Sequence, residues 1–164
     1  MRAKSFNKCL AAYKELLNAG EVQLVYAGLV KYVQSLKTDF SKSLHGQYSV
    51  GNVFQGYMDY TYFYLSNSYL QDRKLKLALV FNHVAARFEI WLLGQTKEIQ
   101  KKYWVLLKDT QWITTAEIPQ YSIFEVSLVD KPDFDSLDKL TDNIRKNFTT
   151  IASAIIASIE LADN

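Results

Sequence analysis

The sequence predicts an α+β fold in which an antiparallel-dominated sheet of four to five strands is covered by helices. Three observations lead to this prediction. Apolar residues recur every three or four positions at both ends of the chain, they alternate with a period of two in the middle, and the connections are short. Because only 6 of the 164 residues are glycine and 2 are proline, we expect no long linker and a single domain over residues 1–164.

Two helices are predicted at the N-terminus. Residues 6–17 place their apolar side chains on one face, and Gly20 is expected to end this helix in a left-handed conformation. Residues 21–40 continue with a second apolar stripe. Because the link is so short, we expect a helical hairpin, with the single cysteine, Cys9, buried among apolar neighbours.

The middle of the chain predicts strands. Residues 48–55 and 57–65 are dense in Tyr, Val and Phe, and they predict two strands or one long strand with a bulge at Gly56. Residues 74–82 and 87–93 alternate between two faces. The four residues that separate them are enough for a hairpin and too few for a crossover.

The last third predicts a helix, a strand and a helix. Gln95 or Thr96 is expected to cap the middle helix, and residues 121–129 alternate as a further strand. Asp133 or Asp135 is expected to cap a C-terminal helix of about 26 residues, because acidic side chains suit the start of a helix.

Composition limits the function classes. A net charge of +2 with 49% hydrophobic residues excludes a disordered chain. Residues 1–10 lack the apolar stretch of a signal peptide, and the longest weakly polar run, residues 151–159, is too short for a membrane span. We therefore expect a cytoplasmic protein without a membrane partner. The basic residues of 71–108 are scattered, which argues against nucleic acid as a partner.

Common catalytic motifs are missing from the sequence. It has no Gly-rich phosphate loop, no Cys-x-x-Cys, no His-Glu-x-x-His and no Gly-x-Ser-x-Gly. The sequence therefore identifies no cofactor and no metal site, and it favours a protein that is not an enzyme.

One polar constellation is a candidate active site. Arg87 and Glu89 are expected on one face of the predicted hairpin, with His83 at its turn and Asp59 in the preceding strand. Such groups, if they converge, can act as catalytic residues or bind a metal, a carboxylate or a phosphate. The alternative is a structural network in which Arg87 and Glu89, two residues apart on one strand, pair with each other.

The order of elements within residues 21–129 is similar to that of the restriction-endonuclease-like fold. That resemblance implies an acid on one strand and Glu-x-Lys on the next, which together hold Mg²⁺ and orient water. The matching tripeptide here is Glu89-Ile90-Trp91, in which tryptophan replaces the lysine. The resemblance therefore implies at most a degenerate nuclease or another metal-dependent hydrolase.

An aromatic cluster precedes the predicted hairpin. Seven aromatic residues lie between positions 54 and 69, and alternation places the tyrosines of residues 60–64 on one face of their strand. Such a row forms either a cross-strand ladder or the wall of a pocket or partner surface. The residues expected to contact a ligand are Tyr57, Tyr60, Tyr62, Tyr64, Asn82 and Trp91.

Residues 151–159 of the C-terminal helix have small residues on one side and isoleucines on the other. Packing on the sheet is one interpretation of this pattern, and a homodimer contact is the other.

Several segments resemble an uncharacterised family of small bacterial proteins, a domain of unknown function. They are residues 54–63 (FQGYMDYTYF), 73–83 (RKLKLALVFNH), 87–94 (RFEIWLLG) and 100–104 (QKKYW). The resemblance covers nearly the whole chain and implies a bacterial, cytoplasmic origin. It implies no activity and no site residue.

The sequence thus identifies no specific function. We interpret the chain as a non-enzymatic binding or interaction domain that self-associates through its aromatic sheet face or its C-terminal helix. Two alternatives stay open. One is the degenerate nuclease or other hydrolase described above. The other is a pocket for a small anionic metabolite, with Arg87 binding the anion.

Overall fold

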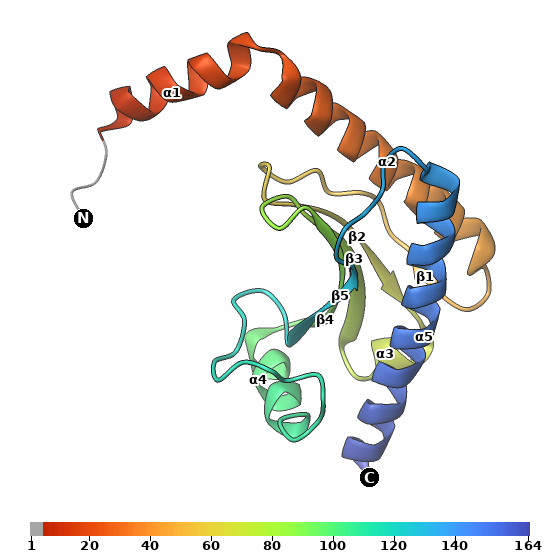
Figure 1. The fold of residues 1–164 in the computed structure, drawn as a ribbon. Helices are drawn as coiled ribbons and strands as arrows, with labels where there is room; N and C mark the ends of the chain where they lie inside the picture. Colours follow the sequence, from red (N-terminus) through yellow and green to blue (C-terminus); the bar gives the residue numbers. More distant parts are fainter. Residues whose placement is uncertain (1–4) are drawn as a thin grey trace.

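The computed structural model describes residues 5–164, which form one antiparallel sheet and five helices (Figure 1). The helices are α1 (Phe6–Asn18), α2 (Glu21–Ser43), α3 (Ser68–Asp72), α4 (Lys97–Leu106) and α5 (Leu137–Asp163). The strands are β1 (Ser49–Val50), β2 (Tyr60–Ser66), β3 (Leu75–Asn82), β4 (Arg87–Gly94) and β5 (Phe124–Val129), paired in chain order. The predicted α+β fold is confirmed.

Strand register gives the sheet two different faces. Leu79 in β3 lies between Phe63 of β2 and Ile90 of β4, and all three are fully buried. This face packs against α2 and α5, which run side by side along it (Figure 1). One position away, Ala78 lies between Tyr64 and Trp91 on the opposite face, which α2 and α5 leave open. We call this second surface the open face.

The main core fills the space between the sheet and the two long helices. Phe40 of α2 meets Phe63 of β2 and Phe148 of α5, with ring centres 5.8 and 5.2 Å apart. The apolar stripes predicted for both helices are therefore the sides that pack. Ile155 and Ile159 of α5 are fully buried, so the isoleucine side of this helix is occupied by the domain's own core.

The two N-terminal helices are present, but the predicted hairpin between them is wrong. They meet at Gly20, which has a left-handed φ of 77°, and they form an open arch in which α1 projects away from the sheet (Figure 1). No residue of α1 is buried, and Phe6 is 80% exposed. Cys9 is exposed as well, against the prediction. The periodicity of a helix shows that it has an apolar side, but it does not show what that side contacts.

Between α2 and β2 the chain is less regular than predicted. β1 has only two residues, and residues 51–59 form a loop that is bridged to β2 between Phe54 and Tyr62. Gly56, expected as a bulge within a strand, lies in this loop with a φ of 70°.

Two helix starts also differ from expectation. The short helix α3, which the sequence did not predict, is capped by Asn67, which accepts a hydrogen bond from the Leu70 amide at 3.0 Å. The N-cap of α5 is Ser136 rather than Asp133 or Asp135. The Thr96 cap of α4 is confirmed. Among the described helices, none combines the length and the apolar character that a bilayer crossing requires.

Candidate functional site

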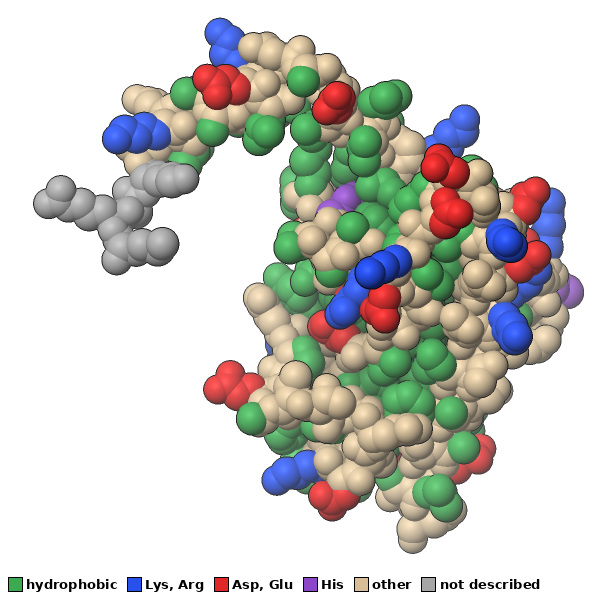
Figure 2. Space-filling view, viewed as in Figure 1, with side chains coloured by type: hydrophobic (Ala, Val, Ile, Leu, Met, Phe, Trp, Pro, Cys, Tyr) green, Lys and Arg blue, Asp and Glu red, His purple; other side chains and the backbone are tan. Residues whose placement is uncertain are grey.

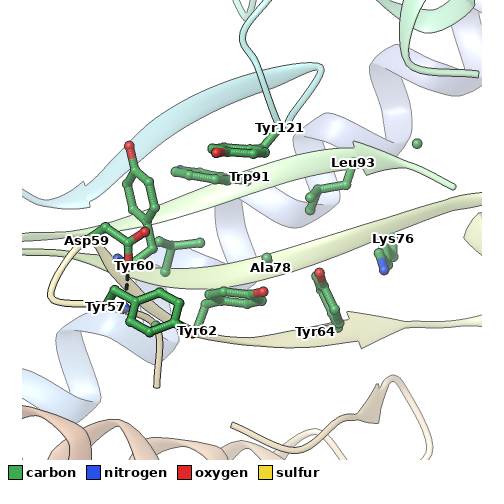
Figure 3. A pocket seen from close by; sticks show the side chains of 13 residues that line it. Tyr57, Asp59, Tyr60, Tyr62, Tyr64, Lys76, Ala78, Trp91, Leu93 and Tyr121 are labelled. Carbon is green, nitrogen blue, oxygen red and sulfur yellow. Dashed lines mark hydrogen bonds between the residues drawn. The ribbon is translucent and has the colours of Figure 1, made fainter. Parts of the chain in front are cut away.

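The open face contains a cavity of about 430 Å³, which we call the tyrosine trough (Figure 3). Its floor is formed by Ala78, Val80 and Leu93, which are buried beneath the surrounding rings. Six aromatic side chains line it: Tyr57, Tyr60, Tyr62, Tyr64, Trp91 and Tyr121. These rings perform on the open face the covering role that α2 and α5 have on the other.

The aromatic rings contact one another across strands and loops. Tyr60 of β2 meets Trp91 of β4 edge-on with ring centres 4.8 Å apart. Phe54, from the loop before β2, stacks on Tyr62 at 5.1 Å. Rings packed in this way are held in place by their neighbours, so the wall of the trough is largely preformed.

Five of the six residues predicted to contact a ligand line the trough, all except Asn82. Asn82 donates instead to Glu89 at 3.2 Å. The sequence interpretation missed Lys76 and Tyr121, which also line the cavity. Lys76 was available from alternation, because it lies two residues from Ala78 on β3, whereas nothing local to Tyr121 indicates its position.

Tyr121 reaches the trough because hydrogen bonds from residues distant in the sequence hold its loop in place. The buried side chain of Gln100 on α4 donates to the carbonyl oxygens of Pro119 and Ser122 at 2.8 and 2.6 Å. The amide of Ile123 then donates to Leu92 of β4 at 2.7 Å. These bonds satisfy buried backbone groups on either side of Tyr121 and hold its ring over β4.

A buried carboxylate fixes the tryptophan wall of the trough. Glu89 is fully buried and accepts hydrogen bonds from Arg87 Nε at 2.6 Å, from Asn82 Nδ2 at 3.2 Å and from Trp91 Nε1 at 2.7 Å. The bond to Glu89 raises the pKa of Arg87. Arg87 and Glu89 thus pair with each other, as in the structural network that the sequence offered as an alternative to an active site. Both oxygens of Glu89 are engaged, and one of them orients Trp91.

His83 lies on the other side of the sheet from this network. Its ring packs against Tyr26 of α2 and Phe81 of β3, and its Nε2 is 2.7 Å from the Thr61 hydroxyl. Because that hydroxyl donates to the Gln55 carbonyl at 2.7 Å, His83 must be the donor to Thr61. His83 therefore helps to hold the loop before β2 and lies outside the trough.

Asp59 has a local structural role at one end of the trough. Its carboxylate accepts hydrogen bonds from the amides of Tyr57 and Tyr60 at 2.8 and 2.7 Å, and these bonds lower its pKa. It precedes β2, and β3 separates that strand from the one that carries Glu89. The four predicted catalytic candidates, Asp59, His83, Arg87 and Glu89, are thus not brought together at one point. Within residues 5–164 no three His, Cys, Asp or Glu side chains are grouped so that they could hold a metal ion.

The half-buried setting of His83 predicts a pH-dependent stability. Burial lowers its pKa in the folded state, although Asp59 opposes this effect. In the unfolded chain the histidine pKa is near 6.5, so the unfolded state binds a proton more readily than the folded state. The free energy of unfolding is therefore highest above about pH 6.5 and falls as the pH drops below that value. Between about pH 7.5 and pH 5.5, the urea midpoint of unfolding should fall further for the wild type than for His83→Gln. Equal losses would contradict this role of His83.

Comparison with known proteins gives a family but no function. The sequence model of a family described as a domain of unknown function (DUF7000) matches residues 6–159. No curated protein and no solved structure matches this chain. The geometry of the chain is therefore the basis for any statement about its function.

Proposed function

This chain belongs to the DUF7000 family, and we propose that it is a non-enzymatic binding domain whose tyrosine trough holds a small ligand with a flat, largely apolar body. The observation that carries this proposal is the cavity of about 430 Å³ on the open face. Its volume lies within the usual range for small-molecule sites, roughly 300 to 1,000 Å³, and aromatic rings dominate its walls, as is common in such sites. The bacterial, cytoplasmic setting implied by the family resemblance is part of the same proposal.

The state of the polar groups supports binding rather than catalysis. A general base or a nucleophile needs a free lone pair that faces the substrate. Glu89 is enclosed by three donors, Asp59 caps two backbone amides, and His83 is turned to the opposite face of the sheet. The same contacts keep Trp91 and the loop before β2 in place, which is the organisation that a preformed binding site needs.

A fluorescence titration with 2-naphthamide, a neutral two-ring probe, tests the proposal. The variant Tyr121→Ala removes a ring that lines the trough, and we expect it to weaken binding about 3- to 10-fold, the value of one aromatic contact. The matched control is Tyr13→Ala on α1, because Tyr13 and Tyr121 are similarly exposed, at 56% and 58%. Equal affinities of the two variants, or no binding to the wild type, would contradict the proposal.

Self-association is a second candidate function, and the observation that favours it is the exposed arm formed by α1 and the start of α2. Phe6, Leu10, Tyr13, Leu16, Leu24 and Val25 are large hydrophobic residues of this arm that are at least half exposed. Figure 2 shows hydrophobic side chains along its underside. Large apolar side chains gathered on an exposed arm are a common mark of an interaction site. We propose that a second copy of the chain covers it, in place of the aromatic sheet face or the C-terminal helix that the sequence suggested for a homodimer contact.

Sedimentation of the full chain tests this second candidate. We expect a dimer for the wild type and a monomer for Leu10→Glu, which places a charge within the apolar side of α1. Ala11→Glu introduces the same charge about 100° around the helix from Leu10, away from Phe6 and Tyr13, and should remain dimeric. A wild-type monomer, or dissociation by both substitutions alike, would rule out a dimer through α1.

A further inference from the structure

One charged side chain of the tyrosine trough has no counter-charge. Lys76 lies in β3, and its Nζ is 3.5 Å from the centre of the Tyr64 ring. None of the ion pairs formed within residues 5–164 includes Lys76. Its partial burial disfavours the charged amine and lowers its pKa. The Tyr64 ring compensates only part of the cost of removing this ammonium group from water, and a bound anion would offset the rest.

The carboxylate that lines the trough, that of Asp59, lies at its other end. Figure 3 shows Asp59 and Lys76 at opposite ends of the row of rings. The pKa of Tyr60 is raised by burial and then by the negative charges of Glu125, Glu89 and Asp59. The trough is therefore positively charged at the Lys76 end and negatively charged at the Asp59 end. This difference attracts the anionic group of a ligand to Lys76 and repels it from Asp59.

Strand geometry sets the distance between Lys76 and the aromatic walls. Ala78 lies directly between Tyr64 and Trp91 in the sheet register. Lys76 is two residues away on the same strand and the same face, which is about 7 Å along the strand. A body of two fused rings placed between Tyr64 and Trp91 therefore brings a carboxylate on its edge to Lys76.

Building on the proposed function, we infer that the tyrosine trough binds a small aromatic monocarboxylate, with its carboxylate on Lys76 Nζ and its rings against Tyr64 and Trp91. This assignment replaces the sequence-based alternative in which Arg87 binds the anion. Arg87 is already paired with the buried Glu89 at 2.6 Å. Lys76 has no ion-pair partner within residues 5–164 and is therefore available to bind an anion.

Three probes of the same shape and different charge test this inference. They are 2-naphthoate, 2-naphthamide and 2-naphthamidine, titrated at neutral pH and low salt against the wild type, Lys76→Met and Lys31→Met. Lys31 is exposed on α2, on the opposite side of the sheet from the trough, and serves as the control. For the wild type and Lys31→Met we expect 2-naphthoate to bind about 10-fold more tightly than 2-naphthamide, equivalent to about 1.4 kcal/mol. In Lys76→Met this preference should vanish while the affinity for 2-naphthamide is retained.

The outcomes separate this inference from the proposed function. If none of the three probes binds, the proposed function itself is contradicted. If 2-naphthamide binds but 2-naphthoate binds no more tightly, or if 2-naphthamidine binds best, the proposed function is retained and the carboxylate assignment is overturned. A preference for 2-naphthoate that survives in Lys76→Met would overturn the assignment of Lys76.

Discussion

Replacing Glu89 with alanine is expected to destabilise the fold by about 3 kcal/mol. The substitution leaves the buried Trp91 indole N–H without an acceptor and removes the partner of Arg87 and Asn82. An unpaired buried donor costs about 1 to 3 kcal/mol, and the cavity left by the side chain adds to it. Arg87 is 39% exposed and can turn to water, so the loss is smaller than for a fully buried ion pair. Urea unfolding measures the difference.

Asp130→Ala is the matched control for this prediction. Asp130 is a second carboxylate near Arg87, 3.9 Å from Nη1, but its side chain is 74% exposed. Exposed ion pairs contribute little, so the expected change is below about 1 kcal/mol. If both variants were equally stable, the buried network would not hold Trp91 as described. Glu89→Ala should also weaken 2-naphthamide binding, because Trp91 loses the contact that orients it.

The second large effect is expected at Gly56. Its φ of 70° favours glycine, and a Cβ added there would lie 2.1 Å from the Tyr60 carbonyl oxygen and 2.6 Å from Asp59 Oδ1. The loop must therefore move in Gly56→Ala, which breaks the hydrogen bonds from the Tyr57 and Tyr60 amides to Asp59. We expect a loss of about 2 to 4 kcal/mol in urea unfolding and a marked loss of 2-naphthamide binding.

Gly46→Ala separates the steric contribution from backbone preference alone. Gly46 has a similar φ of 80°, but a Cβ there meets nothing within 4 Å. The cost should be about 1 kcal/mol, the ordinary penalty of a left-handed conformation for alanine, with no change in probe affinity. Equal effects of the two substitutions would show that the close approach of the Gly56 backbone to the Tyr60 carbonyl does not constrain the loop.

The sequence predicted the elements whose two sides differ in burial. In α2 and α5 the apolar stripe packs on the sheet, and in β3 and β4 the alternation follows the two faces, so periodicity located all four. The tyrosines of β2 were placed on one face for the same reason. The pairing of Arg87 with Glu89 was anticipated as an alternative, because residues two apart on a strand share a side.

The features that were missed depend on contacts between distant parts of the chain. Tyr121 reaches the trough through bonds made by Gln100, about twenty residues earlier, and no local pattern encodes them. The open arch of α1 was missed because an apolar stripe does not identify its partner. His83 was assigned to the wrong cluster, since its side of the sheet depends on Thr61 and Tyr26, which come from other elements.

Binding in the tyrosine trough is tested most directly by the indole N–H signals of the three tryptophans in ¹H–¹⁵N spectra during titration with 2-naphthoate. Substitution of each tryptophan by phenylalanine assigns the signals. Trp91 lines the trough, whereas Trp112 stacks on Phe124 within the core on the other face of the sheet. We expect the Trp91 signal to shift and saturate while that of Trp112 stays in place. An unchanged Trp91 signal, or a shift of Trp112 alone, would contradict a ligand site in the trough.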